Sequence, residues 1–297
     1  MQDNTTTSRC SCCGADHSVF ISCVKNQEGW IDFVSPVQTA MKCNECGHID
    51  ILPILSVVAE ILYPADYLDR GRESRFFKFL LNRGDRQSVR ELHASGFLNV
   101  LDFGSGSGTW VQAARKQGIR AVGYDPNVYD ASGVVCNQLD KYSEDRFDLV
   151  RLEHVIEHLY DLEGALAEIT SILKPGGTLQ IATPNASAFT FRIFRSRWGY
   201  LHAPHHLRIF SPRSLEQTLA RFGFVQISQA RKPNLCTSLS IENVLRGLWY
   251  RKHRGHLPFF GFLLCLGLAI ETVLNFFRVE PSAIHGQFRL LVDTSSD

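Results

Sequence analysis

The stretch VLDFGSGSG, residues 100–108, decides the fold of this chain. An apolar run ends in Asp102, and glycines then stand at every second position, at Gly104, Gly106 and Gly108. Glycine lacks the Cβ that would block the close approach of a ligand, and it tolerates the dihedral angles of a tight turn between a strand and a helix. We therefore predict a strand followed by a ligand-binding loop, with a nucleoside-bearing cofactor as the ligand. A glycine-rich loop without a ligand is the alternative, because a short glycine repeat is a weak signal on its own.

The residues after the glycines strengthen this prediction. TWVQAARKQG, residues 109–118, has apolar residues at helical spacing and ends in a glycine, which predicts a helix with its first N–H groups directed at the ligand. The next apolar segment, IRAVGYD, ends in Asp125, about twenty residues beyond the glycines, where a nucleotide-binding βαβ unit places a carboxylate for the ribose hydroxyls. The loop is D-x-G-x-G-x-G and not the G-x-G-x-x-G of nicotinamide-binding proteins, because Thr109 stands where the third glycine of that pattern would fall.

These motifs resemble the class I S-adenosylmethionine-dependent methyltransferases. The resemblance continues through FDLVRLEHVIEHLYDLEGALAEITSILKPGGTLQIATPN, residues 147–185. It extends to HAPHHLRIFSPRSLEQTLARFGF, residues 202–224, which is similar to the branch of ubiquinone-type O-methyltransferases and of many sugar and small-molecule methyltransferases. The resemblance covers residues 99–230 and implies S-adenosylmethionine as the methyl donor. It assigns to cofactor binding Asp102, Gly104, Gly106 and Gly108 at the loop, Asp125 at the ribose, and Leu139 and Asp140 at the adenine.

The expected fold is α/β, a Rossmann-like, seven-stranded, mostly parallel sheet flanked by helices, because predicted strands alternate with helical segments. The expected strands are 97–103, 120–124, a short one near Val134, 147–152, 178–182, 225–230 and 287–292. We expect three regions: a zinc-ribbon-like module at 1–52, a helical linker that covers the cofactor at 53–93, and the methyltransferase core at 94–297. WIDFV and DILPILSVV are expected strands of the module, and the linker reads as one or two amphipathic helices broken near Gly84.

Six of the nine cysteines stand before residue 47, and four of these six form two copies of one short pattern. The copies are Cys10-x-x-Cys13-Gly and Cys43-x-x-Cys46-Gly, and two C-x-x-C turns can supply the four thiolates of a structural zinc site. The symmetry selects Cys13 over Cys12 as the ligand and leaves Cys23 and His48 outside the site, although His48 could replace one thiolate in a Cys₃His site. Cysteines with free or redox-active thiols are the alternative. Similar modules precede the core of sugar C-methyltransferases, which leaves a role in substrate binding open.

Two insertions, at 187–204 and 234–281, interrupt the expected core. The first mixes aromatic residues with arginines and lies where the resembled family covers its substrate. The second contains WYRKHRGH and the apolar run LPFFGFLLCLGLAI, which is too short to span a bilayer. Two interpretations remain for the second insertion, a buried helical lid or a peripheral membrane contact through 249–277 that would suit a lipid-linked substrate.

The chain has 31 basic and 30 acidic residues, and the near-zero net charge argues against a general nucleic-acid-binding surface. The polar N-terminus, MQDNTTTSRC, lacks the apolar core of a signal peptide. We therefore expect a cytoplasmic protein, with the inner face of a membrane as a further place of action.

A proton acceptor at the site is expected to be a histidine, because the imidazole pKa lies near neutrality. The available histidines are His154, His158, His205 and His206, of which His158, His205 and His206 are the candidate catalytic residues. His205 and His206 are adjacent in a strand-like segment, so at most one of them is expected to face the substrate. HVIEH, residues 154–158, also matches the H-x-x-E-H of a zinc peptidase family, in which the two histidines of one helix face bind metal. That interpretation requires a further downstream ligand and a protease fold, whereas this segment follows an expected buried strand and precedes LKPGG.

The sequence thus predicts a zinc-containing, S-adenosylmethionine-dependent methyltransferase. Its acceptor is expected to be a small molecule: a sugar, a quinone-like or polyketide-like compound, or a lipid-linked intermediate. The alternatives are an RNA or protein methyltransferase that docks its substrate through the zinc module, and a non-catalytic protein that only binds the cofactor.

Overall fold

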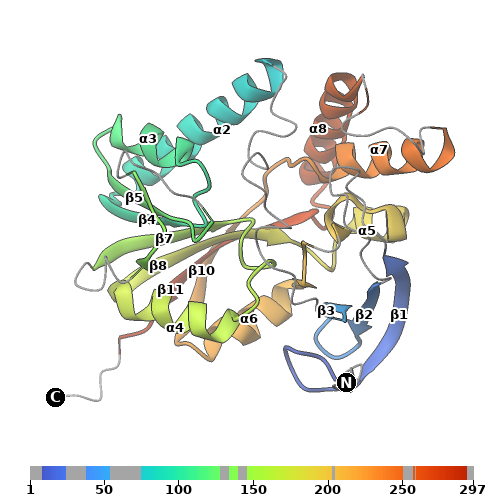
Figure 1. The fold of residues 1–297 in the computed structure, drawn as a ribbon, viewed down its shortest axis with the longest axis horizontal. Helices are drawn as coiled ribbons and strands as arrows, with labels where there is room; N and C mark the ends of the chain where they lie inside the picture. The colour runs from blue at the N-terminus through green and yellow to red at the C-terminus, as the bar shows by residue number, and fades with distance from the viewer. Residues whose placement is uncertain are drawn as a thin grey trace. The chain divides into compact units, whose positions relative to one another are not determined.

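The structure is a computed structural model that describes residues 9–24, 38–53, 75–127, 134–139, 146–202, 205–249, 257 and 259–292 (Figure 1). The strands are β1 (His17–Val24), β2 (Gln38–Cys43), β3 (Ile49–Leu52), β4 (Asn99–Phe103), β5 (Arg120–Tyr124), β6 (Val135–Cys136), β7 (Phe147–Glu153), β8 (Leu173–Pro184), β9 (Arg208–Ile209), β10 (Phe224–Ala230) and β11 (Ala283–Leu290). The helices are α2 (Arg75–Ala94), α3 (Thr109–Arg115), α4 (Leu162–Ile172), α5 (Phe189–Phe194), α6 (Pro212–Ala220), α7 (Cys236–Leu248) and α8 (Phe260–Phe276), with 3₁₀ turns η2 (Arg195–Arg197) and η3 (Gly199–Leu201).

Seven strands form one sheet in the order β10-β11-β8-β7-β4-β5-β6. The pairs β4–β5, β4–β7, β5–β6 and β7–β8 are parallel. In Figure 1, α2 and α3 lie on one face of this sheet and α4 lies on the other. This is the predicted α/β fold, and the strand β4 that carries the VLDF residues stands in its interior.

Local chemistry explains why the flanking helices form where they do. The Asp161 side chain accepts a hydrogen bond from the Gly164 N–H at 2.9 Å and so caps the start of α4. α3 buries Trp110, Val111 and Ala114, which pack with α2 and β4 in one apolar cluster. The burial of these apolar side chains on the sheet holds the helices against the strands that carry the site.

The chain divides into two compact units. Unit 1 contains Met1–Leu62, Thr183–Thr218 and Ala230–His285, and unit 2 contains Tyr63–Ala182, Leu219–Gln229 and Gly286–Asp297. The cysteine-rich region and both insertions thus belong to unit 1, whereas the glycine loop and most of the large sheet belong to unit 2.

Unit 1 has a sheet of its own, in the order β1-β2-β3-β9. Its core joins strand residues such as Ile49 and Ile51 to Trp198 of the first insertion. Trp198 is fully buried and meets Phe191 and Tyr200 edge-on, with ring centroids 5.1 and 5.5 Å away. The first insertion is therefore part of the core of unit 1.

Several sequence expectations need correction. Helix α2 runs without a break through Gly84, because a single glycine weakens a helix without ending it. The LKPGG residues belong to β8, which begins at Leu173 with an irregular register against β7, and Gly176 takes a φ of 75° there. The expected strand at 30–34, the residues 54–58 and the start of the linker lie outside the described residues.

Candidate functional site

The glycine loop after β4 has a left-handed backbone at each of its three glycines. Gly104, Gly106 and Gly108 have φ values of 77°, 52° and 71°, a region that residues with a Cβ rarely adopt. A Cβ on Gly104 would lie 2.4 Å from Val155 Cγ2, and one on Gly108 would lie 2.7 Å from Val135 Cγ2. The alternate-residue spacing is thus required both by the backbone and by the packing of the loop.

Asp125, at the end of β5, holds this loop in shape. One oxygen of its carboxylate accepts a hydrogen bond from the Gly106 N–H at 2.9 Å, and the other accepts one from the Asn127 N–H at 2.9 Å. The N–H groups of Gly104 and Ser105 donate to the Tyr124 carbonyl at 2.7 and 3.0 Å. Because each carboxylate oxygen has two lone pairs, Asp125 can still accept hydrogen bonds from a ribose diol.

Asp102 lies in the sheet beneath the loop and is paired with Arg151, a residue that the sequence analysis did not single out. The Arg151 Nη1 donates to Asp102 Oδ1 at 2.7 Å, its Nη2 lies 3.2 Å from Glu153 Oε2, and its guanidinium stacks 4.7 Å from the centre of the Trp110 ring. Burial acts to lower the pKa of Arg151, but the charges of Asp102 and Glu153 outweigh it and raise that pKa. Asp102 on β4 and Arg151 on β7 stand opposite each other in the register of the sheet, and residues so paired share a face. The opposite charges of the two strands are therefore the sequence signal for this pair.

Of the two residues expected at the adenine, Leu139 is buried and Asp140 lies outside the described residues.

The turn after β7 carries a histidine–glutamate pair against the glycine loop. His154 has a φ of 54°, unusual for a residue with a side chain, and its Nδ1 lies 3.1 Å from the Oε1 of the fully buried Glu157. Burial acts to lower the pKa of His154, but the hydrogen bond and charge of Glu157 raise it. In turn, burial acts to raise the pKa of Glu157, but His154 lowers it. The contact of Val155 with Gly104 brings this turn to the loop, so His154 and the half-buried His158 stand on the element that contacts the loop within unit 2.

The HVIEH residues form a turn and not a helix, which removes the peptidase interpretation. His154 and His158 therefore do not share a helical face as two zinc ligands of that family would.

His205 and His206 are placed differently from the prediction. They lie in a turn before β9 and not in a strand, and both are buried. His206 Nδ1 is 2.7 Å from the Tyr200 carbonyl oxygen, and the His205 ring stacks on that of His202 with centroids 4.9 Å apart. The alternation of side chains in a strand therefore does not apply to them, and they belong to unit 1 together with the first insertion.

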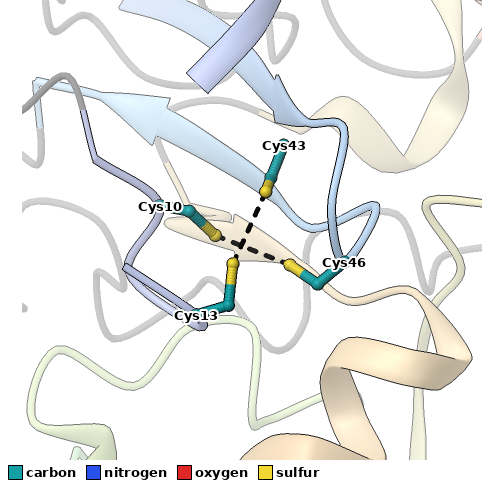
Figure 2. Close-up of side chains that lie close together, drawn as sticks. All are labelled: Cys10, Cys13, Cys43 and Cys46. Atoms are coloured by element: carbon teal, nitrogen blue, oxygen red, sulfur yellow. Dashed lines mark hydrogen bonds between the residues drawn. The ribbon is translucent and has the colours of Figure 1, made fainter. Parts of the chain in front are cut away.

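The four predicted cysteine ligands come together at the end of β2 and in the turn before β1 (Figure 2). Their sulfur atoms all lie within 4.8 Å of one another, with Cys10 to Cys46 and Cys13 to Cys43 both at 3.6 Å. A tetrahedral zinc site with Zn–S bonds of about 2.3 Å requires sulfurs about 3.8 Å apart, whereas a disulfide requires about 2 Å. The arrangement therefore fits a metal site.

The two halves of the cluster are near-copies of one turn. Gly14 N–H donates to the Cys10 carbonyl at 2.9 Å, and Gly47 N–H donates to the Cys43 carbonyl at 3.0 Å. Both glycines have a positive φ, 73° and 74°. Burial raises the pKa of Cys10 to about 12, so this thiol holds its proton at neutral pH until a cation displaces it.

A polar network supports the first turn. The Ser11 hydroxyl donates to Asp50 Oδ1 at 2.6 Å, and His17 Nε2 lies 2.7 Å from Asp50 Oδ2. Burial acts to raise the pKa of Asp50, but His48 and Ser11 hold it well below its usual range. Cys12 directly precedes Cys13 in the sequence, but its thiol points away from the four-cysteine cluster and lies 3.4 Å from the Ser214 carbonyl oxygen.

A cavity of about 600 Å³ opens beside the second turn. Its wall includes Glu45, Cys46, Arg192, Ser211, Arg213 and Glu280. The Ser211 hydroxyl donates to the Cys46 carbonyl, and Arg213 donates to the Glu45 carbonyl at 2.9 Å. The shape of this cavity therefore depends on the order of the Cys43–Cys46 turn.

Known proteins are similar to this chain over about half of its length. Ubiquinone biosynthesis O-methyltransferase of Rhodopseudomonas palustris (strain HaA2) is 24% identical over 164 residues, which are 48% of this chain and 65% of that protein. The protein of the same description from Rhizobium rhizogenes (strain K84 / ATCC BAA-868) is 30% identical over 161 residues, 47% of this chain and 63% of that protein. The chain thus spans just under two thirds of the length of these curated relatives.

Among solved structures, a SAM dependent methyltransferase from Archaeoglobus fulgidus is similar with a TM-score of 0.45 and 19% identity, covering 73% of this chain and all of that one. The Burkholderia thailandensis 1,6-didemethyltoxoflavin-N1-methyltransferase with bound S-adenosylhomocysteine has a TM-score of 0.47 and 16% identity, covering 87% of this chain and 98% of that one. The family model described as Methyltransferase domain matches residues 66–229, more than half of the chain. The protein therefore belongs to this methyltransferase domain family.

Proposed function

We propose that the protein is an S-adenosylmethionine-dependent methyltransferase that acts on a small molecule. The observation that carries the proposal is the Asp125–Gly106 hydrogen bond, which joins the expected ribose carboxylate to the middle of the glycine loop in a chain of the methyltransferase domain family. The acceptor classes that fit the family are a sugar, a quinone-like or polyketide-like compound, and a lipid-linked intermediate.

The residues present fit the cofactor. The three left-handed glycines shape a loop whose own backbone carries no Cβ at these positions, and Asp125 presents acceptors for two ribose hydroxyls. In this proposal Gly104, Gly106 and Gly108 contact the cofactor through their backbone, Leu139 offers an apolar surface to the adenine, and Asp102, held by Arg151, stands at the start of the loop. The bound cofactor supplies an activated methyl group, so the chain itself has to align the acceptor and accept a proton.

Four histidines are candidates for proton acceptance, and we favour the turn after β7 for this role. His154 is oriented by Glu157, and the same turn, with His158, packs on the glycine loop. A residue with a side chain and a positive φ has a strained backbone, and such strain is retained at functional sites. His205 and His206 are kept as candidates from unit 1, where hydrogen bonding and stacking fix their rings.

The four cysteines are proposed to hold a structural zinc ion through Cys10, Cys13, Cys43 and Cys46. Four thiolate ligands leave no open position on a tetrahedral ion, so the metal is assigned to folding and not to chemistry. The metal would affect function by keeping Cys46 and Ser211, which line the cavity, in place.

Titration calorimetry with S-adenosylmethionine and S-adenosylhomocysteine tests the proposal on zinc-loaded full-length protein. We expect one site for each, lost or strongly weakened in Asp125→Ala, while Glu163→Gln, which changes an exposed carboxylate of the same unit, binds normally. Absence of binding by the unaltered protein would refute the proposal. Binding without methyl transfer to any extracted small molecules would favour a non-catalytic protein, and transfer to RNA or protein would favour the other enzyme.

A further inference from the structure

Helix α8, in the second insertion, buries its one charged residue, Glu271, and exposes a row of apolar side chains. Its buried residues are Leu263, Leu264, Gly267 and Glu271. Its exposed residues include an apolar row, Phe262, Leu266, Ala269, Val273 and Phe276, spaced four and three residues apart, which we call the outer stripe. A helix on an aqueous surface normally shows the opposite pattern, with its charged side chains outward.

Close contacts fix the inner face of α8 against its neighbours in unit 1. A Cβ on Gly267 would lie 2.1 Å from the Ser238 Oγ, so the backbones of α7 and α8 meet at small residues. The Glu271 Oε1 accepts hydrogen bonds from the Thr237 hydroxyl at 2.6 Å and from the Ser282 hydroxyl at 2.7 Å. This orientation is therefore set by hydrogen bonds and close packing, and the outer stripe is held outward.

The exposure of the outer stripe is large. Phe262, Val273 and Phe276 are 68%, 53% and 80% exposed, Phe277 at the end of α8 is 71% exposed, and Trp249 at the end of α7 is 72% exposed. Scattered single apolar residues are ordinary on protein surfaces, but a contiguous apolar patch marks an interaction site. α8 is about 25 Å long at 1.5 Å per residue, and no helix of the described part of the chain is long and apolar enough to span a bilayer.

The sequence that leads into α8 indicates what covers the stripe. Residues 250–259 contain Arg251, Lys252 and Arg254 and no acidic residue, whereas Arg246 of α7 is paired with Glu242 at 3.3 Å. An occupant that suits both the apolar stripe and this basic segment is apolar and negatively charged. An anionic bilayer has both properties, whereas a second copy of the chain carries the same basic segment.

We infer that the outer stripe of α8 inserts into the headgroup region of an anionic lipid bilayer, with the helix parallel to the surface. Phenylalanine and tryptophan side chains suit this depth, and each nearby cation gains from the negative surface potential. The contact is independent of methyl transfer, although it would bring the protein to a lipid-linked acceptor.

Vesicle flotation of the full-length protein tests the inference. We expect it to float with vesicles of phosphatidylcholine and phosphatidylglycerol, and much less with phosphatidylcholine alone or at high salt, because salt screens the electrostatic part. The variant Phe262→Ser/Val273→Ser/Phe276→Ser should partition at least about tenfold less, because most of the inserted apolar area is gone. A matched control, Leu98→Ser/Leu291→Ser/Val292→Ser, removes side chains that are 56%, 60% and 55% exposed in unit 2 and should float like the unaltered protein.

Circular dichroism and titration with S-adenosylhomocysteine establish that both triple variants are folded. No flotation of the unaltered protein, or equal flotation of all three proteins, would overturn the inference. A dimer in sedimentation equilibrium that the stripe substitutions abolish would also overturn it, because a second copy would then cover the stripe.

Discussion

The carboxylate of Asp125 accepts a hydrogen bond from the backbone N–H of Gly106 at 2.9 Å, and this bond joins the ends of two parallel strands, β4 and β5. The same carboxylate is the proposed partner of the ribose, so it serves both the shape of the loop and the binding of the ligand. We expect Asp125→Ala to weaken S-adenosylhomocysteine binding by about two orders of magnitude, since a charge-assisted hydrogen bond contributes about 1.5–3 kcal/mol and the loop loses its cap as well. Calorimetry on Asp125→Ala beside Glu163→Gln measures this, and equal affinity of the two variants would remove Asp125 from the site.

Gly104 and Gly96 offer a matched pair for testing the loop. Both have a positive φ, 77° and 81°, but only Gly104 has a close neighbour, Val155, where a Cβ would stand. We expect Gly96→Ala to lower the free energy of unfolding by about 1 kcal/mol from backbone strain, and Gly104→Ala by about 2–4 kcal/mol, because overpacking adds to the strain. Denaturant unfolding checks the difference. When Val155→Ala is added to each variant, it should restore part of the free energy of unfolding that Gly104→Ala loses and none of that which Gly96→Ala loses.

The zinc proposal separates Cys13 from its neighbour Cys12. Cys13→Ser should lose the bound metal and a large share of stability, because a structural zinc ion contributes to folding directly. Cys12→Ser should keep one equivalent of zinc, since the Cys12 thiol points to Ser214. Elemental analysis after dialysis and thermal unfolding with a chelator measure both effects. Zinc retained in Cys13→Ser and lost in Cys12→Ser would reverse the assignment.

The His154–Glu157 pair predicts a specific pH dependence of stability. The folded pKa of His154 is raised above its usual value of about 6.5, so its contribution is full below that value and is lost as pH rises through the folded pKa. The folded pKa of Glu157 is lowered, so its contribution is present above its usual value and is lost as pH falls through the folded pKa. We therefore expect Glu157→Gln to reduce the melting temperature most between about pH 4.5 and 6.5. Equal loss at pH 5.5 and 9 would contradict the pairing.

The same pair predicts a shift in the activity profile. If His154 accepts the proton, activity rises with pH through its raised pKa, and Glu157→Gln, which removes the cause of the raise, moves that rise to lower pH. His158→Gln should leave the midpoint nearly unchanged while it tests the alternative base. If neither substitution moves the midpoint of the pH–activity profile, His154 and His158 are not the proton acceptor, and the role falls to His205 or His206.

Glu271 holds α8 to α7 and to the start of β11. Glu271→Leu leaves the Thr237 and Ser282 hydroxyls buried without this acceptor, and we expect a loss of about 2–4 kcal/mol in the free energy of unfolding. Glu271→Gln keeps an acceptor oxygen and should cost less than half as much. Denaturant titration of the two variants compares these losses, and equal values would show that the hydrogen bonds do not hold the helix.

Short-range sequence patterns were enough to predict the parts of the protein that follow local rules. The glycines at 104, 106 and 108, the carboxylate at Asp125 and the repeated C-x-x-C-G turns are short-range patterns in which one backbone geometry or ligand type dictates the residue. The apolar segments predicted where the strands of the large sheet lie along the chain, because burial on both faces of a parallel sheet leaves a continuous apolar run.

Tertiary structure alone decided how distant segments combine. The pairing of Asp102 with Arg151 and the inward direction of Glu271 depend on contacts between elements far apart in the chain. The strand predicted for His205 and His206 was wrong because buried contacts with Tyr200 and His202 hold them in a turn. The apolar run of the second insertion fitted a lid or a membrane contact equally, and only the packing of Gly267 on Ser238 determined which of its side chains face outward.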